Sequence, residues 1–123
     1  MASSWQQLMA QGNQAFHRQQ WQQALQCYRT ADELLRMKLA CQQPDAETLL
    51  GWICGCHNLA ALYQAQGEMD KALECLNQPH DKAIGLINSN EPALSSLGMD
   101  ASRITYRALM EFQREQLQLR PNR

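Results

Sequence analysis

Valine is absent from the 123 residues, and isoleucine and threonine are sparse. These β-branched residues are enriched in strands because they pack well on a pleated surface, so their scarcity argues against a β-sheet. Good helix formers dominate instead: alanine, leucine, glutamine, glutamate, arginine and methionine. The composition therefore predicts an all-α protein, and the length fits one domain with a modest core.

The chain also lacks a large net charge, which is −1, so the electrostatic basis for binding nucleic acid or an acidic membrane surface is missing. Its longest apolar run, around 49–56, is far shorter than the roughly 20 residues that a membrane-spanning helix needs. No basic segment followed by an apolar one stands near the first residues given, so we expect no secretion signal. The cysteine count, 5, is odd. We therefore expect a cytoplasmic protein with reduced thiols.

What the sequence does contain is an internal repeat. The segment 57–76, HNLAALYQAQGEMDKALECL, is typical of a helical hairpin, because small and apolar residues recur at helical spacing on both sides of Gly67. Its second half aligns with 21–28, WQQALQCY, at a constant offset of 48 positions. The same offset pairs Gln19 with Gly67, so we expect a tight turn at Gln19 although no glycine stands there. A repeated hairpin predicts a stack of antiparallel helices.

The small and aromatic residues of these hairpins resemble the pattern of the tetratricopeptide repeat. The first copy supplies Gly12, Phe16, Trp21, Ala24, Tyr28 and Ala31, and the second supplies Leu59, Ala60, Tyr63, Gly67, Ala72 and Leu76. The resemblance implies hairpins stacked as a right-handed superhelix, here of about five to six helices. The spacing exceeds the family period of about 34 residues, which corresponds to roughly two extra turns in each helix.

Capping and breaking residues predict where the helices begin and end. We expect a single domain, 1–123, made of repeat one (5–41), repeat two (45–78), a kinked extension and loop (79–98) and a capping helix (99–119). Ser3 or Ser4 should cap the first helix and Asp45 the third. Pro79 should break or kink the fourth helix, and Asn88–Pro92 should be a loop. The third helix is apolar nearly all round and should be the most buried.

One cluster could carry chemistry: Cys54, Cys56 and His57. Residues two apart on a helix point in different directions, so the two thiols cannot easily share a metal, and a zinc site would need four nitrogen or sulfur ligands. No catalytic constellation accompanies the histidines. We therefore expect structural thiols, no metal, no cofactor and no enzymatic activity. A thiol or metal-binding protein using this cluster remains the alternative of another class.

The first helix of each repeat is the more informative surface, because in tetratricopeptide stacks it lines the concave groove. Some family members, the co-chaperones of the large heat-shock chaperones, grip a peptide's terminal carboxylate there. The resemblance places Asn13 and Asn58 on the two clamp asparagines, and Arg103 and Arg107, four residues apart, on the final basic pair. Met9 stands where the first lysine of the clamp belongs. The predicted groove residues are Met9, Asn13, His17, His57, Asn58, Ala61, Arg103 and Arg107.

These observations predict a non-enzymatic interaction module that binds a peptide or helix of a partner protein in its groove. Within the same class, a secretion-type chaperone or a co-chaperone that sequesters a client segment is the alternative. Nucleic acid and membrane are not expected partners. The sequence leaves the oligomeric state open, a dimer included.

Overall fold

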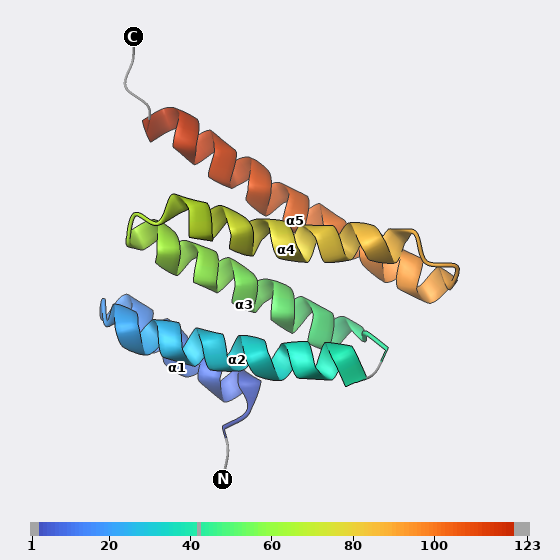
Figure 1. Ribbon diagram of the computed structural model, residues 1–123, viewed down its shortest axis with the longest axis horizontal. Helices are drawn as coiled ribbons and strands as arrows, with labels where there is room; N and C mark the ends of the chain where they lie inside the picture. Colours follow the sequence, from blue (N-terminus) through green and yellow to red (C-terminus); the bar gives the residue numbers. More distant parts are fainter. Residues whose placement is uncertain (1–2, 42, 120–123) are drawn as a thin grey trace. The chain divides into compact units, whose positions relative to one another are not determined.

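The computed structural model describes residues 3–41 and 43–119, which form five α-helices and no strand (Figure 1). The helices are α1 (Trp5–His17), α2 (Trp21–Cys41), α3 (Ala46–Ala65), α4 (Met69–Ile87) and α5 (Pro92–Leu119). The predicted all-α class is confirmed. By its internal contacts the chain divides into two compact units, Met1–Cys75 and Leu76–Arg123, and the division falls within α4.

The predicted capping residues begin α1 and α3. The Ser4 hydroxyl accepts a hydrogen bond from the Gln7 backbone N–H at 3.1 Å, and the Gln7 side chain accepts one from the Ser4 N–H at 2.9 Å. This reciprocal pair is a capping box, which satisfies two otherwise unpaired donors at the helix start. The Asp45 carboxylate accepts from the Thr48 N–H at 2.7 Å in the same way.

The turns that close the two hairpins share one backbone conformation. Gln19 has φ 59° and Gly67 has φ 77°, so both stand in the left-handed region that ends many helices. The hydrogen bonds also correspond: the N–H of Gln20 donates to Ala15 O at 2.9 Å, and the N–H of Glu68 donates to Tyr63 O at 2.8 Å. Every member of one turn lies 48 positions from its counterpart, so the repeat seen in the sequence is present in the backbone.

In the first unit, α2 packs against both α1 and α3. A close approach of α1 and α2 depends on Gly12, because a Cβ added there would lie 2.5 Å from Tyr28 Cε1. As predicted, α3 is largely buried, and its buried apolar side chains are Leu49, Trp52, Ile53, Cys56, Leu59, Ala60, Leu62 and Tyr63. Within the residues described, neither α3 nor another helix is long and apolar enough to cross a membrane.

A polar cluster ties α2 to α3. The Trp52 indole N–H donates to Asp32 Oδ1 at 2.9 Å, and Arg36 Nε donates to Asp32 Oδ2 at 2.7 Å. The Arg36 guanidinium also lies over the Trp52 ring, 5.2 Å from its centroid. A tryptophan N–H that leaves water needs a partner, and one carboxylate serves here both the indole and the cation.

In the second unit, the helix boundaries differ from those predicted. Pro79 does not end α4, which continues to Ile87. The proline lacks the N–H that an interior helical residue donates, but its side chain is fully buried, so tertiary packing outweighs the local preference. The next helix, α5, begins at Pro92 and not near 99. Proline suits the first helical position, where an N–H would have no intrahelical partner.

The loop 88–91 turns the chain back, so that α5 returns along α4 (Figure 1). The two helices approach closely at Gly98, where an added Cβ would lie 2.7 Å from the Ile87 backbone nitrogen and 2.8 Å from the Ala83 carbonyl oxygen. Further along, the buried Thr105 hydroxyl lies 2.8 Å from His80 Nδ1. Small and hydrogen-bonded residues thus fix this hairpin.

Candidate functional site

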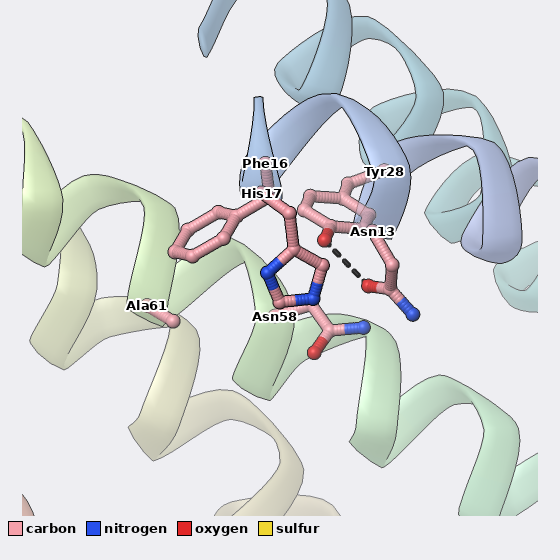
Figure 2. Close-up of a pocket in the computed structure, with 6 residues that line it drawn as sticks. All are labelled: Asn13, Phe16, His17, Tyr28, Asn58 and Ala61. Atoms are coloured by element: carbon pink, nitrogen blue, oxygen red, sulfur yellow. Dashed lines mark hydrogen bonds between the residues drawn. The ribbon is translucent and has the colours of Figure 1, made fainter. Parts of the chain in front are cut away.

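Three helices of the first unit together form a pocket of about 280 Å³. Its lining residues are Asn13, Phe16 and His17 from α1, Tyr28 from α2, and Asn58 and Ala61 from α3 (Figure 2). The volume is slightly below the roughly 300–1,000 Å³ of typical small-molecule sites. A pocket of this size suits a side chain or a chain end better than a large cofactor.

The orientation of Asn13 is set by a hydrogen bond across the pocket wall. The Tyr28 hydroxyl donates to Asn13 Oδ1 at 2.6 Å, and the Asn13 amide nitrogen points away from the tyrosine (Figure 2). Because its oxygen already accepts from Tyr28, the groups that Asn13 leaves entirely open to a ligand are its two N–H donors. No hydrogen-bond partner is found for that nitrogen or for the Asn58 amide within 3–41 and 43–119.

Burial strengthens this arrangement. The phenol of Tyr28 is buried, and desolvation, with smaller contributions from Cys54 and Cys27, raises its pKa above the usual 10.0. The hydroxyl therefore keeps its proton throughout the neutral range and continues to donate to Asn13. The pocket thus presents side-chain amides and an imidazole beside apolar Phe16 and Ala61.

The structure brings together four of the predicted groove residues: Asn13, His17, Asn58 and Ala61. In particular, Asn13 of α1 and Asn58 of α3 line the same pocket. Phe16 and Tyr28 also line the pocket, and the prediction did not include them. The signal for Tyr28 was its hydroxyl, because a tyrosine at a predicted core position needs a polar partner, and Asn13 is that partner.

The lining of the pocket does not include the other predicted groove residues. Met9 is only 8% exposed and lies in contact range of Gly55, so it is a core residue. Arg103 and Arg107 are on α5 in the second unit, where Arg103 Nη1 lies 3.8 Å from Asp100 Oδ1. The closing of the groove by these arginines stays a prediction.

His57 lies outside the pocket and is largely buried, and its Nε2 has no hydrogen-bond partner among the described residues. Burial lowers the pKa of His57 below the usual 6.5, because desolvation disfavours the imidazolium. The unfolded chain therefore binds this proton more readily than the folded one. The resulting stability is fully present above pH 6.5 and is lost as the pH falls below it.

We expect His57→Gln to reduce the loss of stability between pH 7.5 and pH 5. Glutamine has no proton to gain in this range, so the variant lacks the histidine's contribution to the slope. Thermal melts of both proteins at a series of pH values measure the difference. Parallel melting-temperature profiles for the two proteins would show that His57 does not titrate differently in the folded and unfolded states.

The cysteine cluster is divided between environments. Cys54 is exposed and Cys56 is buried, as expected for residues two apart on a helix. Burial, then the nearby Asp32 carboxylate, raises the pKa of Cys56 far above its usual 9.0, and burial likewise raises the pKa of Cys75 to about 11. High pKa values disfavour the thiolate that redox and metal chemistry needs. Across the described part of the chain, no three His, Cys, Asp or Glu side chains are placed to hold a metal.

By its fold and its pocket, the chain is an all-α protein that has a repeated helical hairpin and a small polar pocket on its first unit. Residues 3–120 match the family described as "Protein of unknown function (DUF2753)", and the chain belongs to that family. Comparisons with curated proteins and with solved structures gave no match.

Proposed function

We propose that this chain is a helical-repeat interaction module of the tetratricopeptide type, and that it binds a peptide or helix of a partner protein through the pocket on α1–α3. The observation that carries the proposal is the convergence of Asn13, His17 and Asn58 beside Phe16 and Ala61. Pockets that recognise ligands combine apolar walls with a few placed polar groups.

The partner group that fits this pocket is an acceptor. Asn13 turns its oxygen toward the Tyr28 hydroxyl, which leaves its two N–H donors to bind a partner group. A peptide carbonyl would take one such bond, and a chain-terminal carboxylate would take more than one with greater strength. Phe16 and Ala61 would cover an apolar side chain next to that acceptor. The module performs no chemistry in this proposal, and it acts by holding its partner.

Asn13→Asp separates binding from folding. The new carboxylate still accepts from Tyr28, so the fold is retained, but the amide donors are lost and a negative charge faces the acceptor. A hydrogen bond to a charged group contributes about 1.5–3 kcal/mol, and we expect affinity to fall at least by that amount. Asn58→Asp should weaken binding in the same direction.

The measurement uses a partner captured from native lysate on the immobilised chain, then purified and titrated by calorimetry. Gln14→Glu is the matched control, since Gln14 is the exposed neighbour of Asn13 and undergoes the same amide-to-carboxylate change. Equal affinities for wild type, Asn13→Asp and Asn58→Asp would exclude the pocket as the binding site.

A further inference from the structure

The face of α5 that points away from its own unit carries large exposed apolar side chains. Met99 is 48% exposed, Tyr106 57%, Met110 40% and Leu117 63%. The buried residues of the helix, Ala101, Thr105 and Phe112, lie on the other side at 3.6 residues per turn. Exposed apolar side chains that gather on one face of a helix indicate an interaction site more strongly than scattered ones do.

The spacing along this face is that of a coiled-coil seam. The residues that lie along it are Met99, Arg103, Tyr106, Met110, Gln113 and Leu117. Steps of four and three alternate, which keeps all six on one side of a helix in contact with a partner helix. The seam covers about five turns, or roughly 27 Å of helix. We define these six residues as the α5 seam.

The α5 seam is palindromic. Its steps of four and three residues, and its sequence of apolar and polar side chains, are the same when they are followed from Met99 or from Leu117. If a second α5 runs in the opposite direction, Met99 faces Leu117 of the second copy and Tyr106 faces Met110 of the second copy. The polar Arg103 then faces the polar Gln113 of the second copy. A two-fold axis requires a surface that complements itself in this way, and an unrelated partner helix would have no reason to meet a palindromic pattern.

The charges beside the seam add a second argument. Asp100, Arg107 and Arg114 follow one another at intervals of seven on one flank. In the antiparallel pair, Asp100 lies beside Arg114 of the second copy on both sides of the axis, which gives two ion pairs. In a parallel pair the same residues would face the uncharged flank of Ser102, Leu109 and Gln116.

We propose that the α5 seam is a dimer interface, at which a second copy of this chain packs its own α5 in antiparallel orientation. The interface belongs to the second unit, whereas the pocket belongs to the first, so the proposal does not depend on the proposed peptide binding. Arg107 meets its own copy near the axis, and this repulsion keeps the dimer dissociable. Arg107→Gln should therefore tighten it.

Sedimentation velocity of the full chain under reducing conditions tests the proposal. We expect the molecular mass of the wild type to rise with concentration to twice the 14.0 kDa of one chain. The variants Tyr106→Glu and Met110→Glu should remain single chains. Ile104→Glu is the matched control, because Ile104 is 46% exposed on another side of the same helix, and this variant should dimerise normally. Tyr106→Ser replaces Tyr106→Glu if circular dichroism shows that the glutamate variant is unfolded.

Charge reversal tests the antiparallel register. Asp100→Arg and Arg114→Asp should each raise the dimer Kd about tenfold, because attraction across the axis becomes repulsion. The variant that carries both substitutions should regain the dimer Kd of the wild type. A wild type that stays a single chain at every concentration would overturn the proposal, as would a dimer that survives Tyr106→Glu and Met110→Glu. Binding of the α5 seam only to a helix of another protein would also overturn it.

Discussion

Replacing Gly98 with alanine is expected to lower the free energy of unfolding by about 1–3 kcal/mol, the usual cost of overpacking. An added Cβ would lie 2.7 Å from the Ile87 nitrogen and 2.8 Å from the Ala83 oxygen. Both are backbone atoms, so no side chain can rotate to make room. The two helices must separate instead, which opens the buried contacts of the α4–α5 hairpin. Urea denaturation followed by circular dichroism measures the change.

In the same unit, Gly85→Ala is expected to raise the free energy of unfolding. Gly85 lies in α4, and an added Cβ there would meet no atom within 4 Å. Alanine loses less backbone entropy than glycine in a helix, so this variant should gain about 0.5–1 kcal/mol. If Gly98→Ala is as stable as Gly85→Ala, the close approach of α4 and α5 described above is wrong.

Replacing Ala24 or Ala72 with leucine should also cost about 1–3 kcal/mol. The two residues occupy equivalent positions of the repeat, and neither has any exposed surface. Leucine would add three carbon atoms to a fully buried site, on α2 at position 24 and on α4 at position 72. The same denaturation experiment applies to both variants, and we expect similar losses because the sites correspond.

Gln23→Leu is the control for Ala24→Leu, since Gln23 is the exposed neighbour on the same helix. Leucine at an exposed helical position leaves the packing unchanged and should alter stability by no more than about 0.5 kcal/mol. If Ala24→Leu and Ala72→Leu both prove as harmless as this control, the two positions are not the close crossings that the repeat requires.

The repeat allowed the first hairpin turn to be predicted against its local chemistry. Glutamine is not a residue that favours the left-handed conformation, and no glycine stands near Gln19. Only the offset from Gly67 indicated a turn there, and the backbone confirms it with φ 59°. Long-range pattern can therefore be more informative than local propensity where a sequence repeats.

The predicted break at Pro79 and the predicted start of the last helix near 99 were wrong for the opposite reason, because there the prediction relied on local rules. A proline inside a helix is normally unfavourable, but burial of Pro79 in the core compensates for the missing hydrogen bond. The segment 93–98 gave no clear periodic signal in the sequence. In the structure this segment is helical, and Gly98 packs close to Ala83 and Ile87, a tertiary contact that helical periodicity does not reveal.

The candidate site was predictable to the extent that one helix face could be assigned. Asn13, His17, Asn58 and Ala61 follow from the equivalence of α1 and α3 in the repeat. Tyr28 lies on α2, which the pattern assigned to the outside of the groove, and its hydroxyl reaches the pocket because Gly12 lets the ring pass close to α1. That contact depends on the distance between two helices and could not be read from spacing alone.

Site-specific photo-crosslinking tests the central claim most directly, which is that the pocket on α1–α3 holds a partner protein. A photoreactive phenylalanine derivative at position 61, exposed at the pocket rim, is compared with one at Gln26, which lies on the other side of α2 from Tyr28. We predict one crosslinked partner from position 61 and none from position 26, and its loss when Asn13→Asp and Asn58→Asp are added. Crosslinks that form equally from position 26, or that persist in the double variant, would contradict the account.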